Sequence, residues 1–263
     1  MKSGYIGLWL LLSVALIVIS IISFSNDFSF LGYKLKKSPI AETLLYKEEI
    51  SIDTADIDQF SDTIVEIKEV LVEIDTMPQN IMMFGDSMLG GLAKRMAKYA
   101  KQNGHSVHSI IWDSSTTRLW AESDTLEYFL NKYKPSFVFI SLGSNELYLK
   151  EPRLWKPYVE RILKKLGDIP YVWIGPPNWR KDSGVNDMIE ETTKPNTFFR
   201  SEGMHFDRKS DKIHPTTASS ALWLDSVMRW LPKSAHPILA EMPSDSIGKV
   251  NTGIVYLKAL NAM

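Results

Sequence analysis

Hydrophobic residues form an unbroken run near the N-terminus of this chain. Residues 5–24 are almost wholly apolar, and residues 3–26 carry no charged side chain. About 20 such residues span a bilayer as a helix, so we predict an uncleaved transmembrane anchor within residues 1–26. Two alternatives stay open: a removable signal peptide cleaved near residues 23–25, and a buried core helix.

Residues 27–79 are predicted to form a juxtamembrane linker that contains one amphipathic helix. Its apolar residues recur at alternating spacings of three and four, as one face of a helix requires; they are Ile57, Phe60, Ile64, Ile67, Leu71 and Ile74. The same spacing fits a heptad seam. The helix is therefore expected either to lie on the following domain or to form a short dimerising stalk.

From residue 80 onward, strand-like apolar runs alternate with helix-like ones. The strands are expected at residues 81–84, 106–112, 137–142 and 171–175, and the helices after residue 89, near 126–130, at 157–166 and at 215–231. This alternation predicts a mostly parallel sheet covered by helices on both faces. We assign residues 80–232 to this α/β domain. Residues 233–263 form a C-terminal tail of ambiguous pattern.

Composition excludes several classes of chemistry. The formal net charge of the 263 residues is −1, which implies no general affinity for nucleic acid. The chain has no cysteine, so disulfides, thiolate metal sites and a cysteine nucleophile are excluded. Four histidines, His105, His108, His205 and His236, show no metal-ligand spacing. No metal site is predicted.

Polar residues follow the expected strands, where the functional groups of a parallel sheet gather. Ser87 follows the first strand, residues 113–117 the second, residues 143–146 the third and residues 175–179 the fourth. Asp211 and His214 lie just before the last helix. Serine, histidine and aspartate are the parts of an activated hydroxyl nucleophile. The five segments are expected to meet at one edge of the sheet.

Three of these segments resemble the successive blocks of the SGNH (GDSL-type) hydrolase superfamily. They are Gly85-Asp86-Ser87-Met88, Gly143-Ser144-Asn145-Glu146 and Asp211-Lys212-Ile213-His214-Pro215. The resemblance covers residues 80–231. It implies a flavodoxin-like three-layer α/β/α sandwich, and an activity among esterases, lipases, thioesterases and carbohydrate O-acetyl esterases or O-acetyltransferases.

The resemblance also implies roles for individual residues. Ser87 corresponds to the nucleophile, His214 to the base and Asp211 to the carboxylate that orients it. The oxyanion hole would consist of the Ser87 backbone N–H, a backbone N–H at Ser114 and the Asn145 side chain. Two positions depart from the family pattern. Ser114 stands where glycine is usual, and Glu146, beside Asn145, stands where aspartate is common.

Aromatic and histidine side chains near the same edge are candidates for substrate binding. Trp179 follows the fourth strand and could stack on a sugar ring, although most tryptophans in such loops serve as anchors. His205 lies shortly before the block that contains His214 and is a second candidate contact. Several basic residues could meet an anionic polysaccharide: Arg118, Arg180, Arg200, Arg208 and Lys209.

We therefore expect a membrane-anchored SGNH-type enzyme that acts on O-acyl groups, in the first place O-acetyl groups, of a cell-envelope or secreted glycan. No cofactor is required. Water as acceptor would make it an esterase, and a sugar hydroxyl would make it a transferase. The alternatives are a lipid esterase or thioesterase, and a catalytically silent glycan-binding or scaffold module. Other polysaccharide-synthesis or modification proteins of the envelope are conceivable partners.

The orientation in the membrane follows from two conflicting signals. Lys34, Lys36 and Lys37 follow the apolar run and only Lys2 precedes it, so a literal positive-inside count puts the domain in the cytoplasm. The signal-like position of the run and the expected glycan substrate favour export. We adopt export, which predicts a single-pass protein of the inner (cytoplasmic) membrane with a periplasmic or extracytoplasmic catalytic domain.

Overall fold

The computed structural model describes residues 29–30, 33–34, 73–244, 246–248 and 250–258, and divides the chain into two compact units, residues 1–68 and 69–263. In the first unit, β1 (Ser29–Phe30) and β2 (Tyr33–Lys34) pair in antiparallel fashion. The predicted anchor and the predicted amphipathic helix up to residue 72 lie outside the described residues. Across the described ranges, no helix has the length and apolar character needed to cross a bilayer.

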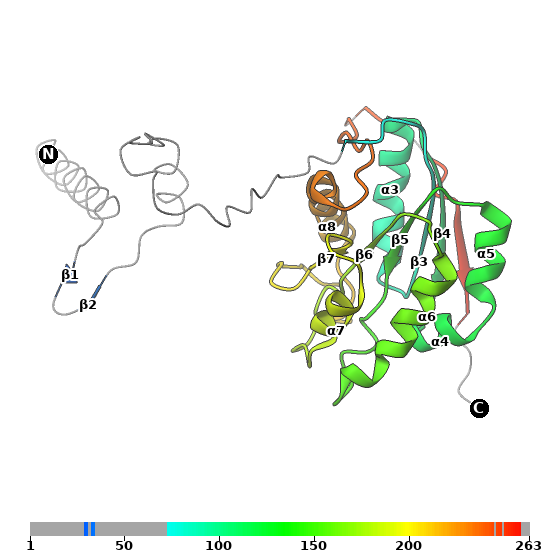
Figure 1. The fold of residues 1–263 in the computed structure, drawn as a ribbon. Helices are drawn as coiled ribbons and strands as arrows, with labels where there is room; N and C mark the ends of the chain where they lie inside the picture. Colours follow the sequence, from blue (N-terminus) through cyan, green and yellow to red (C-terminus); the bar gives the residue numbers. More distant parts are fainter. Residues whose placement is uncertain (1–28, 31–32, 35–72, 245, 249, 259–263) are drawn as a thin grey trace, which may run out of the picture. The chain divides into compact units, whose positions relative to one another are not determined.

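The second unit is built on a six-stranded parallel sheet (Figure 1). Its strands are β3 (Asn80–Gly85), β4 (Ser106–Trp112), β5 (Phe137–Ser141), β6 (Tyr171–Ile174), β7 (Phe198–Phe199) and β8 (Ile254–Leu257). The spatial order is β7-β6-β5-β3-β4-β8. Without β8 this is the 2-1-3-4-5 order of flavodoxin-like folds, in which ligands bind where the order reverses, outside the carboxyl ends of the strands.

Helices cover both faces of the sheet, as the alternating pattern predicted. On one face lie α3 (Leu89–Asn103) and α8 (Thr217–Trp230); on the other lie α4 (Thr117–Glu122), α5 (Thr125–Tyr133), α6 (Lys156–Leu166) and α7 (Val185–Thr192). Short 3-10 helices occupy Pro152–Trp155 and Leu231–Lys233. Side chains of one strand point to opposite faces: Met82 and Phe84 pack towards α4 to α7, whereas Ile81 and Met83 pack towards α3 and α8.

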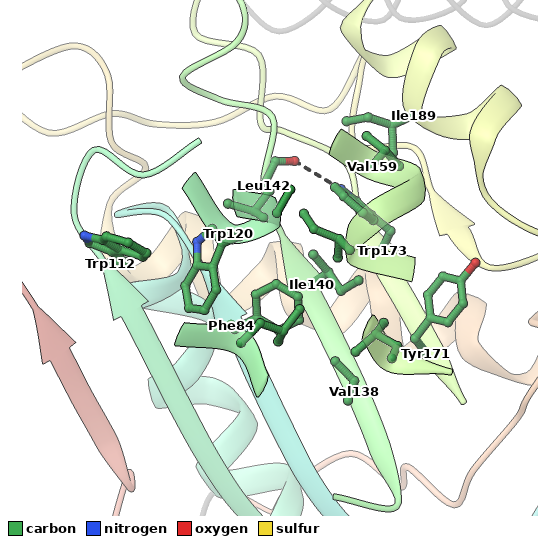
Figure 2. Packing of buried hydrophobic residues seen from close by; sticks show 14 of the residues in the cluster. Phe84, Trp112, Trp120, Val138, Ile140, Leu142, Val159, Tyr171, Trp173 and Ile189 are labelled. Carbon is green, nitrogen blue, oxygen red and sulfur yellow. Dashed lines mark hydrogen bonds between the residues drawn. The ribbon is translucent and has the colours of Figure 1, made fainter. Parts of the chain in front are cut away.

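Two buried tryptophans fix the loops that follow the strands (Figure 2). Trp173 and Trp120 are both fully buried. The indole N–H of Trp173 donates to the carbonyl oxygen of Leu142 at 3.1 Å, and that of Trp120 donates to the Ser115 hydroxyl at 2.9 Å. A buried indole needs such a partner. The hydrophobic core thus holds the two segments that follow β4 and β5.

The C-terminal tail contributes a strand that the sequence pattern did not reveal. β8 pairs with β4 in parallel register, with Tyr256 opposite Ile111 and Leu257 opposite Trp112. The tail also meets the start of the domain, because Asp75 N donates to Pro237 O at 2.9 Å. The α/β sheet therefore extends beyond residue 232, the limit assigned from sequence.

Alanine substitutions at two neighbouring glycines near the start of α3 are expected to change the free energy of unfolding in opposite directions. A Cβ on Gly91 would lie 2.3 Å from Ser220 Cβ, so α3 and α8 would have to separate, whereas a Cβ on Gly90 would lie 3.7 Å from Ile111 Cδ1. We expect Gly91→Ala to lower the free energy of unfolding by about 1–3 kcal/mol and Gly90→Ala to raise it by about 0.5–1 kcal/mol. Urea unfolding measures both, and changes of equal sign would contradict the helix packing.

Candidate active site

Ser87 lies on a sharp turn between β3 and α3. Gly85 ends the strand, and a Cβ there would lie 2.1 Å from Ser141 O, so only glycine fits. The Asp86 N–H donates to Ser141 O at 3.1 Å, and the Asp86 carboxylate accepts from Met88 N at 2.9 Å. These contacts explain why a strand of apolar residues is followed by Gly-Asp-Ser. They fix the Ser87 side chain at the carboxyl end of the sheet.

The structure brings Ser87, His214 and Asp211 together, although Ser87 and His214 are 127 residues apart in sequence. His214 Nε2 lies 2.8 Å from Ser87 Oγ, and His214 Nδ1 lies 2.8 Å from Asp211 Oδ2. The tautomer that satisfies both contacts carries its proton on Nδ1 and accepts the serine hydroxyl at Nε2. This arrangement can withdraw a proton from Ser87 while Asp211 stabilises the imidazolium that forms.

The loop that carries His214 is a tight hairpin fastened by its own aspartate. Asp211 Oδ1 accepts from the backbone N–H groups of Ile213 and His214 at 2.8 and 2.9 Å, and Lys209 N donates to His214 O at 2.8 Å. The Ile213 backbone bond and the His214 side-chain bond lower the pKa of Asp211 to about 2. The carboxylate is therefore ionised at every pH at which the protein would be assayed.

No family model and no curated protein matches this chain. Among solved structures, the psychrotrophic esterase EstA from Pseudoalteromonas sp., inhibited by monoethylphosphonate, is 19% identical; the match covers 59% of this chain and 97% of the esterase with a TM-score of 0.42. A putative lipolytic protein of the G-D-S-L family from Desulfitobacterium hafniense DCB-2 is 17% identical, with 58% and 99% covered and a TM-score of 0.37.

These TM-scores lie below 0.5, so the superpositions do not identify an activity. The strand order, the order of the three blocks and the contact between Ser87 and His214 are observed in this chain itself. The chain has a flavodoxin-like strand order and a Ser–His–Asp arrangement at the carboxyl end of its sheet. The resemblance stated from sequence is thus matched by the arrangement of the residues on which it was based.

Ser114 lines the same cavity as Ser87, and Asn145 lies in the loop that follows β5. Ser114 has φ +58°, a left-handed conformation that favours glycine, which accounts for glycine at this position in the family. Among the hydrogen bonds between described residues, none is donated by the backbone N–H of Ser87 or Ser114. Asn145 donates one amide hydrogen to Ser115 O at 2.8 Å, and its second hydrogen has no described acceptor. The oxyanion-hole role predicted for these three groups stays a prediction.

A cavity of about 460 Å³ opens beside Ser87 on the α3–α8 side of the sheet. Its walls come from the turn after β3, the first turns of α3, the ends of β4 and β8, and the His214 hairpin. The lining residues used below are Ser87, Lys94, Asp113, Ser114, Lys209, His214 and Tyr256. Sequence reasoning missed Lys94 and Tyr256, since an exposed lysine on a helix and an aromatic in an unassigned tail carry no signal by themselves.

The two predicted substrate-binding residues do not line this cavity. Trp179 is half-buried; its indole N–H donates to Ser144 O at 3.3 Å, and its ring packs edge-on against Tyr148 at 5.2 Å. It anchors the loop next to Asn145. His205 has a side chain that is 92% exposed and lies 3.6 Å from Asp207. A substrate contact for either residue stays a prediction.

Arg208 holds the loop that carries His214 in place. Its guanidinium donates to the carbonyl oxygens of Pro177 and Asn178 at 3.0 and 2.8 Å, and also to the carbonyl of Ile213. The loop after β6 and the residue before His214 are therefore joined through one side chain. Arg208 is a positioning residue, and its donors are used by backbone groups of the protein.

Two buried carboxyl groups, those of Asp86 and Glu146, interact with each other near the turn that carries Ser87. Asp86 is fully buried, and burial raises its pKa to about 8, with a further contribution from the Glu146 carboxylate. Glu146 is 1% exposed, its Oε1 accepts from Thr117 N at 2.5 Å, and burial raises its pKa as well. Glu146 thereby fixes the start of α4.

The raised pKa of Asp86 predicts the pH dependence of stability. Between about pH 4 and pH 8 the folded protein keeps a proton that the unfolded chain releases, so the free energy of unfolding falls as the pH rises through this range. The decrease is at most about 1.4 kcal/mol per pH unit. Asp86→Asn should flatten this slope and Asp168→Asn, an exposed control, should not. Urea unfolding at pH 5 and pH 8 tests this, and an unchanged slope in Asp86→Asn would refute the assignment.

Proposed function

We propose that this chain is a serine-dependent O-acyl ester hydrolase or acyltransferase that uses an acyl-serine intermediate. The observation that carries the proposal is the continuous hydrogen-bonded chain from Ser87 Oγ through His214 to Asp211, with each contact at 2.8 Å. It opens onto a cavity large enough for a small substrate. A catalytically silent module would have no need for this alignment.

The reaction follows from the positions of these atoms. The Ser87 hydroxyl passes its proton to His214 Nε2 while Oγ attacks the ester carbonyl. The N–H groups of Ser87 and Ser114 and the Asn145 amide stabilise the negative oxygen. His214 then returns the proton to the departing alcohol, leaving an acyl group on Ser87. Water or a sugar hydroxyl, deprotonated in turn by His214, releases the acyl group.

The cavity walls favour a polar substrate over a long acyl chain. Charged and hydroxyl-bearing side chains make up most of the lining, and its larger apolar side chains are Met88, Ile111 and Pro215. A lipid chain would require a longer apolar channel. We therefore favour an O-acetylated glycan as the substrate, as the sequence suggested, over a lipid ester or a thioester.

The place of action is part of the same proposal. The apolar run within residues 1–26 would anchor the enzyme in the cytoplasmic membrane, with the catalytic domain outside the cytoplasm. Envelope polysaccharide-synthesis or modification proteins would then be its neighbours. A C-terminal reporter that is active only in the cytoplasm would overturn this orientation.

The test is acetyl release from an acetylated oligosaccharide by the parent protein and by Ser87→Ala. We expect release by the parent and only background release by the variant. Equal release from both proteins would discard the proposal. With an acetyl donor and a deacetylated oligosaccharide present together, acetylated oligosaccharide identifies a transferase, and free acetate alone identifies an esterase.

A further inference from the structure

Three of the arginines named above as candidates for binding an anionic polysaccharide already have partners within the protein. Arg118 pairs with Glu122, Arg200 pairs with three carboxylates, and Arg208 binds backbone carbonyls. Lys94 and Lys209 differ from them. Both are exposed, both line the cavity, and neither forms an ion pair with any described residue.

The two lysines reach the cavity from different parts of the fold. Lys94 extends from the second turn of α3, and Lys209 belongs to the hairpin that carries His214. Asp113 also lines the cavity and is exposed, but it lies within 4 Å of neither ammonium group. The charged side chains of the lining thus sum to one net positive charge while His214 is neutral.

Tyr256 supplies an apolar surface on the same wall. It lies on β8 opposite Ile111, which is also a lining residue. Its side chain is 61% exposed, and no aromatic ring or cation in the described part of the chain packs on it. An exposed tyrosine face beside polar groups is suited to packing against a sugar ring.

We infer that this cavity binds an anionic sugar as the alcohol part of the ester, with Tyr256 against the ring and Lys94 and Lys209 paired with its negative group. The inference rests on the proposed function and names the substrate class for it. A two-carbon acyl group occupies only a small part of about 460 Å³, so the cavity has room for the sugar. The two ammonium groups can pair with the negative group of an anionic sugar, and a neutral sugar has no such group.

The experiment compares two substrates that differ by one carboxylate: an O-acetylated methyl hexoside and the O-acetylated methyl hexuronoside of the same configuration. With the full chain, we expect kcat/KM to favour the hexuronoside by about tenfold, the size that two exposed ion pairs supply. The difference should be in KM and should shrink as salt is raised. Asp113→Asn should increase the preference.

Matched variants isolate the two lysines. The double variant Lys94→Gln/Lys209→Gln should lose most of the preference, whereas Lys98→Gln, one turn further along α3, should keep it. Tyr256→Leu should raise KM for both sugars. Equal kcat/KM for the two sugars in the parent, or a preference that survives in the double variant, would overturn the inference.

A wrong nucleophile assignment can be distinguished from a wrong sugar specificity by the same experiment. If the parent hydrolysed neither sugar, or if Ser87→Ala hydrolysed both as the parent does, the nucleophile assignment would fail. Binding of the two unacetylated sugars would then be compared by calorimetry. Tighter binding of the hexuronoside that requires both lysines would still support the inference, and equal binding would overturn it.

Discussion

Replacement of His214 by alanine is expected to lower kcat for ester turnover by about 10⁴-fold or more. His214 Nε2 is 2.8 Å from Ser87 Oγ and accepts its proton, and without a base the hydroxyl is a weak nucleophile at neutral pH. KM should change little, because the loss falls on the chemical step. Steady-state kinetics on an acetyl ester measures both constants.

A double variant tests whether Ser87 and His214 act together in one step. When two residues act as one catalytic unit, removing the second costs little further rate once the first is gone. The kcat of Ser87→Ala/His214→Ala should therefore be about as low as that of either single variant. His236→Ala, at a histidine outside the cavity lining, should retain the parent rate. Activity in His214→Ala within tenfold of the parent, with the fold intact, would show that another group is the base.

Replacement of Asn145 by alanine is expected to lower kcat by about 10²–10³-fold with little change in KM. The amide is already oriented by its bond to Ser115 O at 2.8 Å, so its second hydrogen is fixed in direction before the oxyanion forms. The loss therefore appears only where negative charge develops. Asn145→Asp should be slower still, because it replaces a donor by a carboxylate of equal size.

The free energy of unfolding of Asn145→Ala shows whether its loss of kcat comes from the missing amide donor or from disorder of the loop. Loss of the bond to Ser115 should cost about 0.5–1.5 kcal/mol of unfolding free energy, too little to unfold the domain. If Asn145→Ala kept kcat within threefold of the parent while remaining folded, the amide would not belong to the oxyanion hole.

The sequence predicted those parts of the fold that carry a periodic or local signal. The long strands and helices alternate between residues 80 and 231, and the turn at Gly85 needs glycine because Ser141 O leaves no room for a Cβ. The triad was predicted because its motifs follow the expected strands in the order of a known superfamily. Local chemistry and chain order were sufficient for these features.

Features that depend on tertiary contacts were not predictable in this way. β8 is four residues long and is a strand because β4 offers it an open edge; no pattern within the tail indicates this. The indole bond of Trp179 to Ser144 O is likewise a tertiary contact that the sequence does not show. Lys94 lines the cavity because α3 begins beside Ser87. The spacing of residues in the sequence does not reveal this proximity.

Covalent labelling with an organofluorophosphonate, followed by peptide mass spectrometry, tests the central claim most directly. An activated serine displaces fluoride and retains the phosphonyl group on its oxygen. The account predicts a single modified peptide with the adduct on Ser87, and a labelling rate that falls by several orders of magnitude in His214→Ala. An adduct on a different serine, or equal labelling rates of Ser87 in the parent and in His214→Ala, would contradict it.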